Sequence, residues 1–168
     1  LASRYALAMD SRDLDALVGL FVEDVRVGAD ACGREALRES FDQQLREVGI
    51  TILFVGNHVI DFEGDDKASG HVYCRAEVQD GERWIHQAIL YRDRYRRCDG
   101  QWYFVRRLHR LWYGLEAPTS PIQQPDARHG HPWRFNITPI LGRYARTCLL
   151  YNSPSPRDRG CSRMPSSA

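Results

Sequence analysis

The chain has 168 residues, 27% of them charged, and a formal net charge of +1. This length is sufficient to bury one hydrophobic core without metals or disulfides, so we expect a single domain. The balanced charge gives no basic surface of the kind that binds nucleic acid, although 22 arginines accompany a single lysine. No apolar run approaches the roughly 20 residues that cross a bilayer, so we expect no membrane partner.

The five cysteines form an odd set without a C-x-x-C pair: Cys32, Cys74, Cys98, Cys148 and Cys161. This pattern argues against a disulfide framework and against a structural zinc site. The N-terminus also lacks the basic and then apolar pattern of a signal peptide. We therefore predict a cytoplasmic protein without a metal site.

Helical spacing dominates the first 49 residues. Residues 2–9 are strong helix formers, and Asp10-Ser11 interrupts them, with Ser11 placed to cap a second helix. Val25 and Val27 alternate with polar neighbours and predict a short strand. A third helix is expected between Gly33 and Gly49, because its apolar residues recur on one stripe.

From Ile50 onward, the spacing of the apolar residues changes from the helical period to a period of two residues, which is typical of strands. Residues 51–62 and 68–78 are rich in β-branched and aromatic residues, and the stretch 81–113 alternates on both sides of Asp99-Gly100, a dipeptide typical of a type I′ hairpin turn. Helices followed by a four-strand meander predict an α+β fold, in which an antiparallel sheet carries the helices on one face.

A two-residue turn that pairs Cys98 with Gln101 would place Asp93 opposite Arg106 and Tyr91 opposite Leu108. One face of this hairpin would then combine aromatic rings with charged residues, among them Asp93, Arg106 and Trp112. Such a face suits a lined pocket, and the alternative is a packed core with one ion pair at its rim. The same register puts His86 and His109 on the opposite face, away from any shared metal site.

The composition changes after Tyr113, because all eight prolines lie beyond it. We expect a folded domain over residues 1–114 and a largely irregular Pro/Arg/Ser-rich tail over residues 115–168, which contributes little to stability.

No nucleotide-binding, nucleophile-elbow or metal-binding motif is present, so we expect no cofactor. Any catalysis must come from side chains gathered in a pocket. Asp10 is a candidate, because a carboxyl group wedged between helices and apolar strands would have its pKa raised by desolvation, as a general acid or base requires. Its alternative role is helix capping.

The residues that carry a resemblance are Arg4-Tyr5, Asp10 to Leu17, Leu20 to Val25, Gly33 to Ala36, Asn57 to Asp61, Tyr91 to Tyr95 and Asp99 to Phe104. With these residues the first 114 positions resemble the SnoaL-like branch of the nuclear transport factor two-like superfamily. The resemblance implies a cone, in which a curved antiparallel sheet wraps three N-terminal helices and encloses an apolar pocket. Its members include ketosteroid isomerases, polyketide cyclases and scytalone dehydratases.

Two comparisons within this superfamily point to different chemistry. Tyr5 stands where the ketosteroid isomerase pattern has its oxyanion-stabilising tyrosine, but the position of the general base falls on Ala29, beside Asp30. Asp10 matches the aspartate of the scytalone dehydratase pattern, whereas the two catalytic histidines of that pattern become Leu53 and Val78.

The resemblance implies a protein that binds a small hydrophobic, polycyclic or polyketide-like molecule. Two classes of function follow: a cofactor-free isomerase, cyclase or dehydratase that uses acid-base chemistry, and a non-catalytic ligand-binding or assembly module. The catalytic candidates are Tyr5 and Asp10, and the ligand-binding candidates are Leu53, Asn57, Tyr91, Asp93, Arg106 and Trp112. We also expect a homodimer formed through the face of the sheet opposite the helices, where Leu90, Tyr103, Val105 and Leu111 would otherwise be wet.

Overall fold

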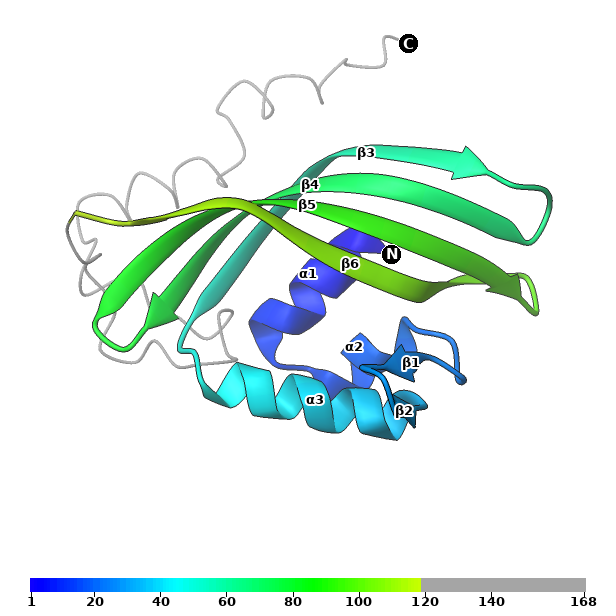
Figure 1. Cartoon of the computed structure of the whole chain (residues 1–168), viewed down its shortest axis with the longest axis horizontal. Coiled ribbons are helices and arrows are strands. Elements are labelled where there is room, and N and C mark those ends of the chain that lie inside the picture. The colour runs from blue at the N-terminus through cyan, green and yellow to red at the C-terminus, as the bar shows by residue number, and fades with distance from the viewer. Residues whose placement is uncertain (119–168) are drawn as a thin grey trace, which may run out of the picture.

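The computed structural model describes residues 1–118. Four long strands form an antiparallel sheet in the order β3-β4-β5-β6, and the sheet is curved, with the three helices all on its concave side (Figure 1). The predicted α+β cone is confirmed. The elements are α1 (Ala2–Ser11), α2 (Leu14–Gly19), β1 (Arg26–Val27), β2 (Ala31–Cys32), α3 (Arg34–Arg46), β3 (Thr51–Phe62), β4 (Lys67–Asp80), β5 (Arg83–Cys98) and β6 (Gln101–Glu116).

The first helix runs further than its sequence pattern indicates. It continues through Asp10 to Ser11 and ends at Arg12, whose backbone is left-handed with φ of 58°. Asp13 caps α2 by accepting the Ala16 N–H at 2.9 Å, so the expected cap at Ser11 is wrong. The Ser11 hydroxyl instead donates to the Leu7 carbonyl within α1.

The connection between α2 and α3 contains a two-strand hairpin where one strand was expected. Arg26 pairs with Cys32 and Val27 with Ala31. Just before this hairpin, the Val22 N–H donates to the Phe104 carbonyl and the Phe104 N–H donates to the Leu20 carbonyl. Residues 20–22 therefore lie along β6 and cover this part of its free edge.

The hairpin of β5 and β6 turns at Asp99-Gly100, as predicted, and both residues have positive φ. Cys98 pairs with Gln101 and Tyr95 with Phe104, but the register then shifts by one residue. Val105 is the additional residue, and such a β-bulge re-aims the side chains that follow it. The predicted pairing of Asp93 with Arg106 is wrong, because Asp93 pairs with Arg107 and Tyr91 with His109.

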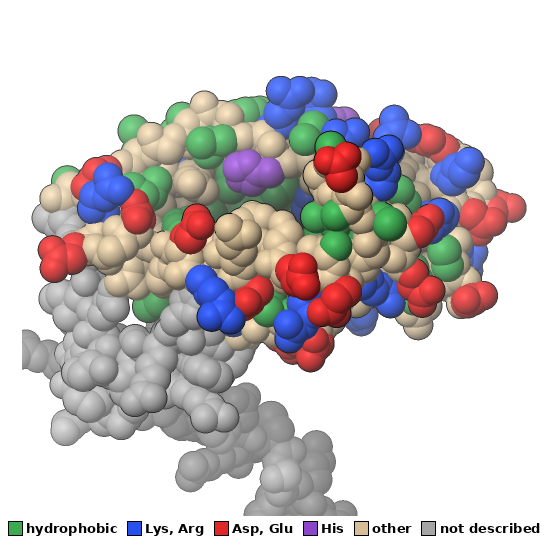
Figure 2. All heavy atoms as spheres, turned by 60° about the horizontal axis from the view of Figure 1, so that its bottom comes forward, with side chains coloured by type: hydrophobic (Ala, Val, Ile, Leu, Met, Phe, Trp, Pro, Cys, Tyr) green, Lys and Arg blue, Asp and Glu red, His purple; other side chains and the backbone are tan. Residues whose placement is uncertain are grey.

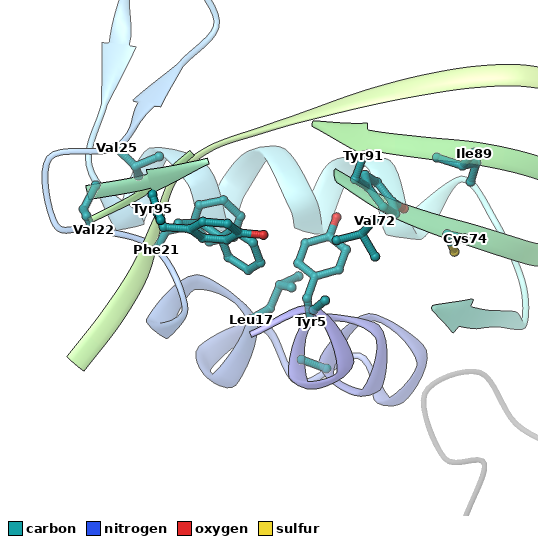
Figure 3. Packing of buried hydrophobic residues seen from close by; sticks show 14 of the residues in the cluster. Tyr5, Leu17, Phe21, Val22, Val25, Val72, Cys74, Ile89, Tyr91 and Tyr95 are labelled. Carbon is teal, nitrogen blue, oxygen red and sulfur yellow. The ribbon is translucent and has the colours of Figure 1, made fainter. Parts of the chain in front are cut away.

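The core lies between the helices and the concave, inner face of the sheet. Phe104 and Leu17 are fully buried, and the ring of Tyr5 lies 6.1 Å from that of Phe104. In Figure 3 the Tyr5 side chain rises from α1 toward Tyr91 of β5. The aromatic rings thus join the first helix to the two C-terminal strands.

The convex, outer face carries only part of the apolar set predicted for it. Leu90 stands there opposite Tyr73, as expected. Leu111 pairs with the buried Ile89 and Val105 contributes to the cavity described below, so neither belongs to the outer face. We define the outer patch as the exposed side chains of Ile52, Phe54, Tyr73, Trp112, Tyr113 and Leu115.

Within residues 1–118, no helix is long and apolar enough to span a membrane. Most of the predicted tail, from residue 119 onward, lies outside the described residues.

Candidate functional site

A cavity of about 1110 Å³ lies between the helices and the inner face of the sheet. Most of its wall is apolar, and Figure 2 shows a hollow in which hydrophobic side chains surround a histidine. A volume of this size accommodates a small organic molecule, since ligand pockets occupy roughly 300–1,000 Å³. Its apolar wall residues include Met9, Phe21, Leu37, Phe41, Leu53, Ala76, Val78 and Ile89.

Asp93 and Arg107 form a buried ion pair beside this cavity. The Asp93 side chain is 0% exposed and that of Arg107 is 3% exposed. Arg107 Nε donates to Asp93 Oδ1 at 2.9 Å and Arg107 Nη2 donates to Oδ2 at 2.6 Å. This two-pronged geometry fits a planar guanidinium to a planar carboxylate and fixes the orientation of both groups.

Three aromatic rings enclose the rest of the guanidinium. Its carbon lies 4.4 Å from the ring centre of Tyr5, 4.3 Å from that of Tyr91 and 4.4 Å from that of Phe104. Nη1 is buried and has no hydrogen-bond partner among the described residues, so the π faces stabilise its charge. Burial alone would lower the pKa of Arg107, but the hydrogen bonds and the charge of Asp93 raise it overall. A fixed positive charge therefore stands in the cavity wall.

The Tyr5 hydroxyl is available to a ligand. The side chain lines the cavity, and within residues 1–118 no hydrogen-bond partner is found for its hydroxyl oxygen. Burial raises the pKa of Tyr5 to about 12. The phenol thus stays protonated at neutral pH and can donate a hydrogen bond to a ligand oxygen.

A second tyrosine connects the ion pair to a histidine. The Tyr95 hydroxyl donates to Asp93 Oδ2 at 2.9 Å and lies 3.1 Å from His58 Nε2. Burial lowers the pKa of His58, so the imidazole is neutral near pH 7. The chain of His58, Tyr95, Asp93 and Arg107 is a polar network inside an otherwise apolar core.

His109 is the only histidine in the cavity wall among the described residues. Its ring meets the Tyr91 ring edge to face at 5.7 Å, and burial lowers its pKa. The prediction that His109 lies on the outer face is wrong, because the bulge at Val105 turns it inward. A neutral imidazole beside an apolar cavity is suited to accept a proton.

Asp10 fastens α1 to β3. Its Oδ2 accepts the Leu53 N–H at 3.0 Å and its Oδ1 accepts the Thr51 hydroxyl at 3.2 Å. Desolvation raises the pKa of Asp10 against the opposing effects of these hydrogen bonds and of Arg12. The expected raised pKa is therefore present, but Asp10 is not part of the cavity wall. Because α1 continues through Ser11, Asp10 points about 140° away from Tyr5 around the helix.

The predicted site residues fall into three groups. Tyr5, Leu53, Tyr91 and Arg106 line the cavity, and Asp93 lies behind its wall in the ion pair with Arg107. Asn57 is exposed at a bulge in β3, with φ of 45°, and Trp112 is 57% exposed and packs on Tyr73 of the outer face. The structure does not bring these last two residues to the cavity.

Two residues of the site were missed, Arg107 and His109. Both follow the bulge at Val105. Alternation counted without this extra residue therefore assigns each of them to the wrong face of the sheet. The hairpin sequence alone carries no signal for the bulge, since its extra residue is a valine rather than the glycine that often marks one.

The chain belongs to the SnoaL-like domain family, whose model matches residues 1–108. Among curated proteins, none matches the sequence.

Several solved structures share the fold. A protein provisionally described as a scytalone dehydratase from Novosphingobium aromaticivorans is 24% identical with a TM-score of 0.60, over 68% of this chain and 80% of that one. The hexachlorocyclohexane dehydrochlorinase LinA-type3 of Novosphingobium barchaimii is 22% identical with a TM-score of 0.63, over 74% and 90% of the two chains. A variant of Rv3472, a Mycobacterium tuberculosis protein of unknown function, is 28% identical with a TM-score of 0.56, over 66% of each chain.

Proposed function

We propose that the cavity binds a small, largely hydrophobic molecule, polycyclic or polyketide-like, and that the protein catalyses its isomerisation, cyclisation or dehydration without a cofactor. The observation that carries this proposal is the guanidinium of Arg107, held by Asp93 and by three aromatic rings next to the free hydroxyl of Tyr5. A fixed positive charge and an O–H donor in an apolar wall would stabilise the oxyanion of an enolate-like transition state.

The proposed reaction also requires a proton acceptor, and two groups are candidates. His109 lines the cavity, and its lowered pKa keeps it neutral. Asp10 lies behind Thr51 and Leu53 and would have to exchange its present hydrogen bonds before it could act. Among the neighbouring structures, the name dehydrochlorinase describes an elimination. Loss of HCl, like dehydration and isomerisation, requires removal of a proton from carbon.

The experiment begins with a panel of steroid and aromatic polyketide compounds, screened by thermal shift and then for turnover. For a compound that is turned over, Tyr5→Phe and His109→Gln should each lower kcat by roughly 10²-fold or more, while binding changes less. Tyr73→Phe and His86→Gln are matched controls, because both residues are exposed on the outer face. If Asp10→Asn rather than His109→Gln abolishes turnover in a folded protein, Asp10 is the proton acceptor.

The second candidate function is a ligand-binding or assembly module without catalysis. The tied carboxylate of Asp10 favours it, since this group matches the catalytic aspartate position of the dehydratase pattern yet holds two helix-to-strand hydrogen bonds. Tight binding of several ligands by the wild-type protein, with turnover of none, would support this module and contradict the catalytic proposal.

We also propose a cytoplasmic homodimer. Cys32, Cys74 and Cys98 are all free thiols, as is usual in a reducing compartment. The outer patch supplies an apolar surface for a second copy of the chain. We propose neither a nucleic-acid partner nor a membrane partner.

A further inference from the structure

Arginines gather where the cavity passes the free edge of β6. The wall of the cavity includes Arg26, Arg94, Arg106 and Arg107, against a single carboxylate, Asp24. Arg107 is paired with Asp93, and Asp24 is itself engaged by Arg96. Among the described residues this leaves three arginines without a carboxylate partner, and only Arg26 has a backbone acceptor, the Ala29 carbonyl at 3.2 Å. We call Arg26, Arg94 and Arg106 the arginine rim.

The bulge at Val105 places two members of this rim opposite each other. Because of the extra residue, Arg94 of β5 stands directly opposite Arg106 of β6. Like charges directly opposite each other on neighbouring strands repel. An anion placed between them would replace this repulsion with two attractive contacts.

The same bulge turns Arg107 inward to the aromatic cavity. Arg94 and Arg106 alternate with Asp93 and Arg107 along the two strands, so they stand on the opposite side of the strands from the ion pair. The cavity nevertheless borders Arg94 and Arg106 as well as Arg107.

We infer that the arginine rim is an anion subsite and that the ligand is an amphipathic organic acid. Its apolar or aromatic body occupies the cavity, and its carboxylate binds between Arg94 and Arg106, with Arg26 supplying a third charge. This inference rests on the proposed binding function and narrows its ligand class. A carboxylate suits the rim because it accepts paired hydrogen bonds from guanidinium groups. A phosphate on a carrier such as coenzyme A shares the anionic chemistry, and the experiment separates the two sources.

The test compares molecules that differ only in charge. Anthracene-2-carboxylate and anthracene-2-carboxamide are titrated into the full chain by calorimetry at low and at physiological salt. The carboxylate should bind roughly tenfold more tightly than the amide at low salt, and added salt should reduce the difference. Arg94→Gln and Arg106→Gln should each weaken binding of the carboxylate roughly threefold and leave binding of the amide unchanged.

Arg92→Gln is the matched control, because Arg92 is exposed on β5 and lies outside the cavity wall. It should leave both affinities unchanged. A second readout does not depend on ligand. If Arg94 and Arg106 repel each other, Arg94→Gln should raise the melting temperature of the free protein slightly, and should raise it less when Arg106 is already glutamine.

Equal affinity for the carboxylate and the amide would overturn the anion subsite while leaving the proposed cavity function in place. Failure of both compounds to bind would count against the cavity function and against the subsite together. Binding of the coenzyme A thioester of the same acid, but not of the free acid, would assign the rim to phosphate and overturn the carboxylate assignment.

Discussion

Arg107 combines a structural role with the chemical role proposed for it. It holds a full charge in a side chain that is 3% exposed, and Asp93 and three rings surround it. Removing one member of such a pair leaves the other charge buried without compensation. The stability of the fold and the electrostatics of the cavity therefore depend on the same contact.

The first prediction concerns this ion pair. Arg107→Met and Asp93→Leu should each lower the free energy of unfolding by about 3–5 kcal/mol, because each leaves an unpaired buried charge. The double variant should be more stable than either single one, since both charges are then gone and the Tyr95 hydroxyl can still donate to His58. Urea unfolding, monitored by fluorescence, measures the free energy of unfolding of the two single variants and the double variant. Additive losses in the double variant would show that the pair is not coupled.

The second prediction concerns pH. Burial lowers the pKa of His58 and of His109. A histidine whose folded pKa lies below its unfolded value of about 6.5 stabilises the fold above that pH, and this stabilisation is lost as the pH falls through the folded pKa. The melting temperature should therefore drop between about pH 7 and pH 5. The drop should be smaller in the variant His58→Gln with His109→Gln.

His86→Gln is the control for this pH experiment, because His86 is exposed on the outer face. Asp10 has the opposite effect on how stability depends on pH. Its raised pKa means that protonation of Asp10 favours the fold as the pH falls. An unchanged pH profile in the double histidine variant would contradict the prediction.

At the scale of helices and strands, contacts between residues far apart in the sequence determine where a helix ends. The composition of residues 2–9 predicts α1, but the helix ends at Arg12, whose guanidinium reaches the Met9 and Gly49 carbonyls and the Thr51 hydroxyl. Two of these three partners lie in or next to β3. A pattern confined to the helix could not reveal these partners, and for this reason the break expected at Asp10-Ser11 is misplaced.

The same reasoning explains the register of the C-terminal hairpin. Asp99-Gly100 fixes the turn and the first four residue pairs, which the sequence predicts correctly. The bulge at Val105 follows the residue that exchanges backbone hydrogen bonds with Leu20 and Val22. Those partners lie more than 80 positions away in the chain. Tyr5, Leu53 and Tyr91 could thus be assigned to the cavity from pattern and resemblance, whereas Arg107 and His109 could not.

The third prediction tests the junction of α1 with β3. Asp10→Ala should lower the free energy of unfolding by about 1–3 kcal/mol, because it leaves the Leu53 N–H without its acceptor. Asp10→Asn should cost less, since its amide oxygen can still accept that N–H. Hydrogen exchange at the Leu53 amide gives the local readout and should be faster only in the alanine variant. If Asp10→Ala is as stable as the wild-type protein, Asp10 does not stabilise the junction of α1 with β3.

At the scale of the molecule, the fold class follows from the spacing of the apolar residues. They recur at helical spacing before residue 50 and at strand spacing after it. The antiparallel sheet follows because successive strands are joined by short turns. The apolar outer face was also expected, and Leu90 lies on it as predicted, but Val105 and Leu111 do not. The bulge at Val105 turns Leu111 inward, and the second bulge, at Trp112, returns Tyr113 to the outer face.

The fourth prediction concerns the domain boundary. Every residue of the described core cluster precedes residue 105, and the Ala117 N–H donates to the Trp84 carbonyl at the end of β6. Removal of residues 121–168 should therefore lower the melting temperature by less than about 5 °C, which corresponds to roughly 1 kcal/mol in a domain of this size. Differential scanning calorimetry of both chains makes the comparison. A larger drop would extend the folded unit past residue 120.

The last prediction is a homodimer through the outer patch. Phe54 is 76% exposed and Trp112 is 57% exposed, and water-exposed rings of this size favour association. Light scattering at micromolar concentration should give about twice the 19.4 kDa of one chain, and Phe54→Lys should reduce the mass to that of one chain. Leu7→Lys is the control, because Leu7 is 48% exposed on α1 and lies away from the patch. A wild-type mass of one chain, or dissociation by Leu7→Lys as well, would contradict a dimer through this face. The exposed charge of Arg92 on β5 repels that of the second copy across this face, so added salt should strengthen the association.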